Sequence, residues 1–296
     1  MKIFTILLIL ISPSAFIPTA FGKVKVVASI STLKSLVESV GKDLVEVSSV
    51  GKPTEDPHFV EVRPSFIMNV TDAKMYVMVG LSLDIWAKPL IESSRNNGIV
   101  IVNASLGIKP LDVPTERVTP LMGDVHPEGN PHYWVDPYNV PTIVKNIVSG
   151  LATVDPEHSK TYQLQAKTFL DELKVKTTEW DKRLAPFKGA KLVVYHASWN
   201  YFLNHFHFLQ VAEVEPKPGI PPSGAHTQEV IQIATREKVK AILIEPYYSD
   251  AHPKLIAEKT GAKLLKMPQM VGGLPGTDTY IKLMEYNVTE IEKALK

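Results

Sequence analysis

Short apolar runs alternate with segments of helical spacing along the first part of the chain. Strands are predicted by four runs rich in β-branched and apolar residues, at 23–30, 44–50, 74–79 and 99–103. Helices are predicted between them, where apolar residues recur at helical spacing or a proline opens a turn, at 31–40 and 64–73. Strands that alternate with helices indicate a parallel sheet covered by helices.

Residues 156–184 differ from this pattern because they contain no glycine or proline after Pro156. One stripe of side chains recurs there at steps of three and four: Tyr162, Ala166, Phe169, Leu173, Thr177, Trp180 and Leu184. The stripe predicts one helix of roughly 40 Å at 1.5 Å per residue. Such a helix exceeds the usual 8–20 residues. It could bridge two lobes, or it could be a core helix of one larger domain.

The alternation resumes after this helix. Three further runs predict strands, at 191–195, 239–244 and 262–266. Helices are predicted at residues 223–238, where a serine can cap the first turn, and at residues 280–295, which are amphipathic. The second part of the chain is therefore also predicted to be α/β.

Residues 1–22 have the features of a secretory signal. Lys2 precedes an apolar core at residues 3–11, and Ala20 and Gly22 supply the small residues of a cleavage site. Pro13 and Pro18 interrupt the apolar run too early for a membrane span of about 20 residues. We expect an exported, soluble protein.

Composition narrows the possible chemistry. The 296 residues include 32 Lys and Arg against 31 Asp and Glu, so no basic surface for nucleic acid is expected. The absence of cysteine excludes thiolate catalysis, Cys-ligated zinc and lipidation at an N-terminal cysteine. We therefore expect a periplasmic protein without a lipid anchor, whose metal ligands come from His, Asp and Glu.

Three of the nine histidines lie at or near predicted strand ends: His58, His132 and His196. In open α/β sheets ligands collect at the carboxyl ends of strands, so these imidazoles could converge on Zn²⁺, Mn²⁺, Fe²⁺ or Ni²⁺. Each could instead be an ordinary loop or packing residue. His126 lies close enough to His132 in sequence to assist metal capture.

Five segments, in order, resemble the cluster A-I solute-binding proteins, which capture metals for zinc, manganese and iron ABC importers. They are DPHFVEVRPS, GLSLDIW, GNPHYWVDP, VVYHASWNYF, and AILIEPYYSD followed by IAEKTGAKLL. The resemblance implies two parallel-sheet lobes, at residues 23–150 and 187–296, joined by one rigid helix within 151–186. It implies that His58 and His132 from the first lobe and His196 from the second hold the metal in the cleft between them.

The chain departs from the family at the fourth ligand, usually an Asp just after the last strand. Residues 266–269 contain no carboxylate. Glu245, at the end of a predicted strand, is our first choice to replace it, Asp278 is the second, and water is a third possibility. The loop before His132 is short, so we expect one metal ion per chain. Three imidazoles and one carboxylate favour Zn²⁺, with Mn²⁺ or Fe²⁺ as alternatives.

The resemblance implies a monomer that delivers its metal to a membrane ABC permease and is not an enzyme. A secreted zinc hydrolase is an alternative, in which Glu245 would be the general base, but the chain has neither an HExxH nor a GxSxG motif. A surface adhesin is a second alternative, which no repeat or anchor supports.

Overall fold

The computed structural model describes residues 22–119, 122–123 and 125–296, so nearly all of the predicted signal segment lies outside the described residues. The strands are β1 Val24–Ala28, β2 Val45–Ser49, β3 Met75–Met78, β4 Val100–Asn103, β5 Lys191–Val194, β6 Leu209–Glu213, β7 Ala241–Ile244 and β8 Lys263–Lys266. The α-helices are α1 Ser31–Gly41, α2 Pro64–Thr71, α3 Ala87–Ser94, α4 Val140–Val154, α5 Ser159–Leu184, α6 Asn200–Phe206, α7 Gly224–Arg236, α8 Ala251–Thr260 and α9 Tyr280–Leu295. No helix in these described ranges has the length and apolar character of a membrane span.

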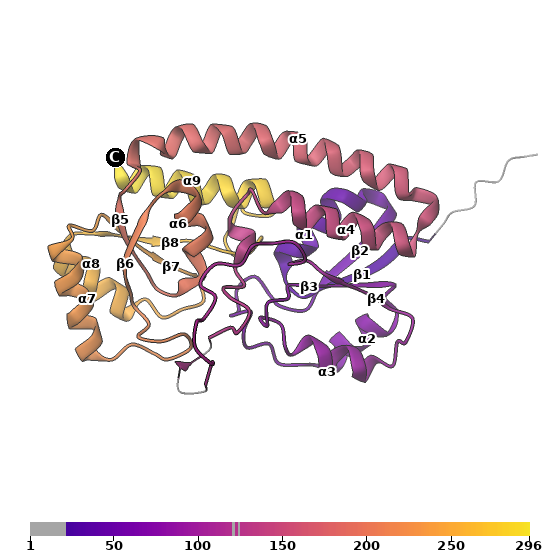
Figure 1. The fold of residues 1–296 in the computed structure, drawn as a ribbon, viewed down its shortest axis with the longest axis horizontal. Coiled ribbons are helices and arrows are strands. Elements are labelled where there is room, and N and C mark those ends of the chain that lie inside the picture. The colour runs from indigo at the N-terminus through magenta and orange to yellow at the C-terminus, as the bar shows by residue number, and fades with distance from the viewer. Residues whose placement is uncertain (1–21, 120–121, 124) are drawn as a thin grey trace, which may run out of the picture.

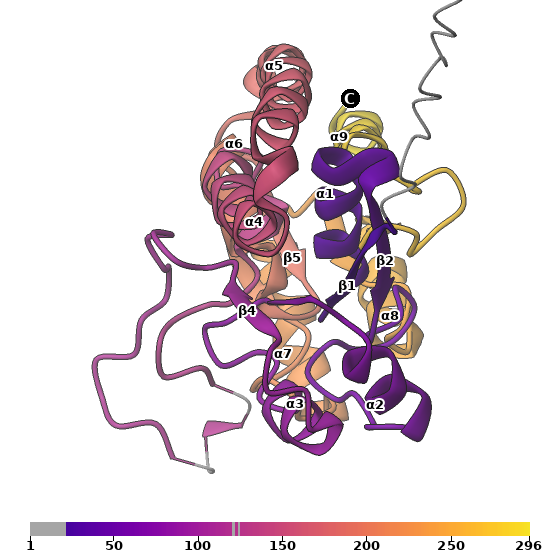
Figure 2. The ribbon, with the colours of Figure 1, turned by 90° about the vertical axis from the view of Figure 1, so that its right-hand side faces the viewer.

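The strands form two parallel sheets of four with the same order, β2-β1-β3-β4 and β6-β5-β7-β8 (Figure 1). In the first sheet, α1 and α4 lie on the face toward α5, whereas α2 and α3 lie on the opposite face (Figure 2). We call each sheet with its helices a lobe. The predicted α/β fold with two parallel-sheet lobes is confirmed.

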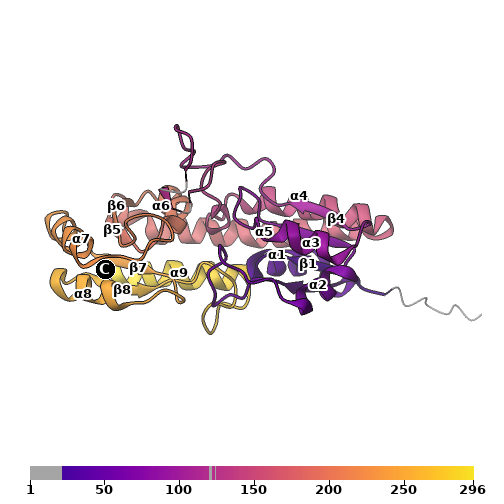
Figure 3. The ribbon, with the colours of Figure 1, turned by 90° about the horizontal axis from the view of Figure 1, so that it is seen from below.

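Helix α5 connects the lobes and runs along both of them (Figures 1 and 3). It packs on α1 and α4 of the N-terminal lobe and on α9 of the C-terminal lobe. Its 26 residues are preceded by a 3-10 turn at Pro156–His158, which takes up the start of the predicted helix. All seven residues of the predicted stripe are buried. The bridging interpretation of this helix is therefore correct.

The sheet faces toward α5 share one apolar core that continues from one lobe into the other. Two smaller cores lie beneath the outer helices, one in each lobe. Hydrogen bonds also cross between the lobes: Trp134 Nε1 donates to Gln269 O, and the Tyr280 hydroxyl donates to Trp134 O, both at 2.8 Å. Wide separation of the lobes would expose this shared apolar core to water. We therefore expect only small movements of one lobe relative to the other.

The pattern of the sequence missed helices α3, α4, α6 and α8 and strand β6. Helix α4 contains Gly150, which weakens a sequence-based helix assignment. A Cβ atom at Gly150 would lie 2.3 Å from Val102 Cγ2 and 2.7 Å from Met75 Sδ, so this glycine lets α4 approach the sheet closely. Strand β6 is an edge strand with exposed or half-buried side chains and lacks an apolar run.

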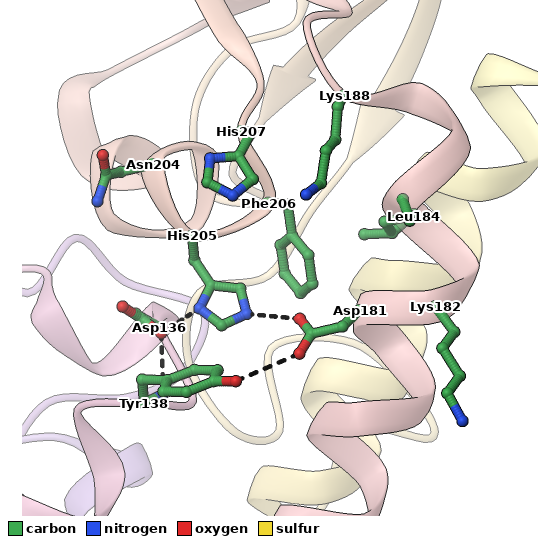
Figure 4. A pocket seen from close by; sticks show the side chains of 11 residues that line it. Asp136, Tyr138, Asp181, Lys182, Leu184, Lys188, Asn204, His205, Phe206 and His207 are labelled. Atoms are coloured by element: carbon green, nitrogen blue, oxygen red, sulfur yellow. Dashed lines mark hydrogen bonds and ion pairs between the residues drawn. The ribbon is translucent and has the colours of Figure 1, made fainter.

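His205 joins both lobes to the long helix. Its Nδ1 lies 2.9 Å from Asp136 Oδ1 in the N-terminal lobe, and its Nε2 lies 2.9 Å from Asp181 Oδ1 on α5. These groups line a cavity of about 630 Å³, where the Tyr138 ring lies against His205 (Figure 4). Burial alone would lower the pKa of His205, but the hydrogen bonds and charges of the two carboxylates outweigh burial and raise it.

We expect the His205 contacts to stabilise the fold more in acid than in base. The folded pKa is raised above the unfolded value of about 6.5, so the contribution is complete below that pH and is lost as pH rises through the folded pKa. His205→Gln should therefore lower the free energy of unfolding by about 1–2 kcal/mol at pH 6, and by less at pH 9. Urea unfolding at both pH values measures the difference.

His226→Gln is the matched control, because His226 pairs with one exposed carboxylate, Glu229 at 3.3 Å, and its Nε2 lies 3.0 Å from the backbone carbonyl of Glu213 rather than from a second carboxylate. It should change stability by less than about 0.5 kcal/mol at either pH. An equal loss at pH 6 and pH 9 for His205→Gln would show that His205 acts through packing rather than charge.

Candidate metal centre

Two of the predicted ligands follow neighbouring strands of the second sheet. His196 comes two residues after β5, and Glu245 comes directly after β7. Strands β5 and β7 pair in parallel, and Tyr195 N donates to Leu243 O at 2.8 Å, which extends the pairing up to the histidine. The order of strands changes direction at this pair, and such a switch point is where α/β sheets bind ligands.

The other two histidines lie in segments shaped by local hydrogen bonds. Asp56 Oδ1 accepts from the backbone N of His58 at 3.0 Å and from its Nδ1 at 2.6 Å. Asn130 Oδ1 contacts His132 in the same way, at 3.0 Å from N and 3.1 Å from Nδ1. Asp and Asn stabilise turns by such bonds to the residue two positions later. The sequences Asp-Pro-His and Asn-Pro-His therefore fix both the turn and the ring.

The structure brings the three histidines together from both lobes. The ring centroids of His58, His132 and His196 lie 5.1–5.3 Å apart. One ligand nitrogen from each ring lies within 4.8 Å of the other two, and all three residues are buried. Imidazole nitrogens that bind one Zn²⁺ at about 2.0–2.1 Å must lie within about 4 Å of one another, so small movements of these rings suffice for a common ion.

Each ring is oriented through its Nδ1. The third acceptor is Glu215, whose Oε2 lies 2.8 Å from His196 Nδ1. An imidazole that donates its Nδ1 hydrogen carries its lone pair on Nε2, the atom left to bind a metal. His132 Nε2 is buried and has no hydrogen-bond partner among the described residues.

Asp56, Asp136 and Tyr195 lie near the three histidines in sequence, so each is a candidate to orient a ring. Asp56 does bond a histidine, but Asp136 contacts His205 and Tyr195 stacks on Tyr248 instead. Asn130 and Glu215 were missed. Asn130 could have been found from its match to the Asp56 spacing, whereas Glu215 follows the missed strand β6 and gave no local signal.

Burial and charge act differently on the histidines. Burial and the positive charges of the neighbouring histidines lower the pKa of His132 well below its usual value, so this ring is neutral and ready to bind a cation. Burial would also lower the pKa of His196, but the hydrogen bond and charge of Glu215 raise it overall. His196 therefore holds a proton more readily than His132 does, and a metal ion must displace that proton from His196 in order to bind.

Glu245 is fully buried and interacts electrostatically with His196. Its Oε1 accepts a hydrogen bond from the Ser198 hydroxyl, and its Oε2 has no hydrogen-bond partner within the described ranges. Burial raises its pKa to about 7, against the smaller opposing effects of the His196 charge and Ser198. A carboxylate held near neutrality, with one oxygen unused, has the chemistry of a ligand that ionises when a cation arrives. The compact three-residue group does not include it.

The alternative fourth ligand has a different environment. The Asp278 side chain is 65% exposed and pairs with Lys282 at 2.9 Å. Gln269, in the stretch where the family usually has an Asp, donates from Nε2 to the Tyr247 hydroxyl and is buried. Of the two candidate carboxylates, Glu245 is buried and Asp278 is exposed and paired with a lysine.

A cavity of about 400 Å³ opens beside His132 and His196, and His126 and Glu213 also line it. The His126 ring stacks on His58, with 5.3 Å between centroids and 27° between planes. The cavity wall beside His132 and His196 therefore carries an acid and a further imidazole.

Known metal-binding proteins resemble this chain over nearly its whole length. The family model described as "Zinc-uptake complex component A periplasmic" matches residues 26–294. The chain is 27% identical to the iron-binding protein YfeA of Yersinia pestis, over 92% of this chain and 86% of YfeA. It is 24% identical to the manganese-binding lipoprotein MntA of Halalkalibacterium halodurans, over 89% of this chain and 86% of MntA.

A crystal structure of ZnuA has the same fold. It superposes with a TM-score of 0.80 at 24% identity, over 93% of this chain and all of that one. Since the family model spans both lobes and the connecting helix, the chain belongs to the ZnuA family of periplasmic components of zinc-uptake complexes.

Proposed function

We propose that this protein captures one divalent transition metal ion, Zn²⁺ above others, and delivers it to a membrane ABC permease. The observation that carries the proposal is the buried group of His58, His132 and His196, with a ligand atom from each within 4.8 Å of the others. Glu245 completes the ligand set in this proposal. Three neutral imidazoles and one carboxylate form the closed four-coordinate shell that zinc prefers.

Manganese and iron are the alternatives, because relatives are named as iron-binding and manganese-binding proteins. Mn²⁺ favours more oxygen ligands than one carboxylate supplies, and Glu245 holds its proton up to a pKa of about 7. A site with three imidazoles therefore favours zinc over manganese.

A role in capture rather than catalysis agrees with the closed shell. A zinc hydrolase keeps an open coordination position and a general base beside it. With Glu245 as a ligand, neither is supplied. We infer a monomeric periplasmic protein without enzymatic activity. We also infer that it carries no lipid on an N-terminal cysteine, since the chain contains no cysteine. Residues 1–22 are the proposed signal peptide, 23–150 and 187–296 the lobes, and 151–186 the connecting segment.

Metal loading of the mature protein tests this proposal. After exposure to equal concentrations of Zn²⁺, Mn²⁺ and Fe²⁺ under anaerobic conditions, elemental analysis should find one zinc per chain, because three imidazoles favour it. One manganese or iron per chain would keep metal capture but reject zinc. No bound metal would reject the whole proposal.

A further inference from the structure

The two histidines of the N-terminal lobe are oriented by residues that the C-terminal lobe also contacts. Asp56, which accepts from His58 through Oδ1, accepts through Oδ2 from the Tyr248 hydroxyl at 3.0 Å. Asn130, the partner of His132, donates through Nδ2 to Ala197 O at 2.7 Å. The hydrogen bonds between the lobes therefore act on Asp56 and Asn130, the two residues that orient the rings of His58 and His132.

Tyr248 is held by its own lobe. It lies in the turn after β7, where its backbone N donates to Glu245 O at 3.2 Å. Its ring stacks on Tyr195, with 4.3 Å between centroids and 16° between planes, and its centroid lies 6.3 Å from that of His196. The C-terminal lobe thus fixes where the Tyr248 hydroxyl can point.

The position of the segment that carries His58 depends on side-chain hydrogen bonds to both lobes. Residues 50–63 form neither helix nor strand. Trp86 Nε1 donates to Pro57 O at 3.0 Å and ties the segment to its own lobe, whereas the Tyr248 bond ties it to the opposite lobe. A carboxylate held at only one oxygen can rotate, so the second bond restricts the direction in which Asp56 presents Oδ1 to His58.

We propose that Tyr248 is a positioning residue for the metal site: from the C-terminal lobe, its hydroxyl holds Asp56 so that the His58 ring faces the metal. Affinity for the metal then depends on the approach of the two lobes as well as on the ligands. This inference rests on the proposed function, because it assigns His58 as a ligand.

Tyr248→Phe removes the hydroxyl and keeps the ring that stacks on Tyr195. We expect the dissociation constant for Zn²⁺, measured by competition with a chelating dye, to rise by roughly 10-fold, the low end for loss of a group that orients a ligand. Tyr162→Phe is the matched control. It removes a tyrosine-to-aspartate bond of 2.6 Å to Asp155, beside the first turns of α5, and should leave the dissociation constant unchanged.

The same substitution in a His58→Ala background separates positioning from a structural role. If Tyr248 acts through His58, the double variant should bind Zn²⁺ within about twofold of His58→Ala alone. An equal loss in both backgrounds, or no loss in the wild-type background, overturns the inference while zinc capture stands. If the wild-type protein binds no Zn²⁺, the proposed function fails first and this inference with it.

Discussion

His196→Ala should lower the affinity for Zn²⁺ by about a thousandfold. A four-ligand zinc site binds with about 10–16 kcal/mol, or about 3 kcal/mol per ligand, which corresponds to roughly 100–1,000-fold. We expect the upper end because His196 is the one member of the three-histidine group that the C-terminal lobe supplies, so its loss leaves only the imidazoles of the N-terminal lobe. Titration of the purified protein against a chelator of known zinc affinity measures the change.

His158→Ala is the control for this experiment. His158 bonds Asp155 at 2.8 Å just before α5 and is not part of the three-histidine group. Its affinity for Zn²⁺ should equal that of the wild-type protein. Circular dichroism without metal confirms that both variants are folded. A folded His196→Ala protein with unchanged zinc affinity would remove His196 from the ligand set.

Trp180→Ala should lower the free energy of unfolding by about 3–5 kcal/mol, the usual cost of truncating a buried tryptophan. Trp180 is fully buried in the stripe of α5 and donates from Nε1 to Glu285 Oε2 on α9 at 2.9 Å. The substitution leaves a cavity where the long helix packs on the C-terminal lobe. Guanidinium unfolding, followed by circular dichroism, measures the loss.

Val175→Ala is the matched control on the same helix. Its side chain is 69% exposed, so its truncation should change stability by less than about 0.5 kcal/mol. Similar effects of both substitutions would show that the buried stripe does not stabilise the interface between α5 and the C-terminal lobe. Trp180→Phe should fall between the two, because it keeps much of the apolar surface but loses the bond to Glu285.

The periodicity of the sequence sufficed to predict those elements whose buried residues repeat regularly within one segment. The stripe of α5 could be predicted because a helix repeats its buried face every three or four residues, and all seven predicted positions are buried. Helix α4 was missed because Gly150 has a tertiary role: it permits close contact with Val102 and Met75, which lie elsewhere in the sequence.

The sequence by itself determined the chemistry that the site can use. With no cysteine in the chain, histidine and carboxylate are the available metal ligands, and His58, His132 and His196 were candidates from the sequence. The turns that present two of these rings could also be read locally, since the Asp-Pro-His and Asn-Pro-His segments contain both bonding partners.

Only the tertiary structure decided how these groups meet. Glu215 reaches His196 because β6 pairs with β5, and Tyr248 reaches Asp56 across 192 positions of sequence because the lobes share a core. The raised pKa of Glu245 likewise comes from burial, which depends on packing from all sides. Contacts between distant segments leave no local pattern, because sheet pairing and lobe packing bring them together only in the folded chain.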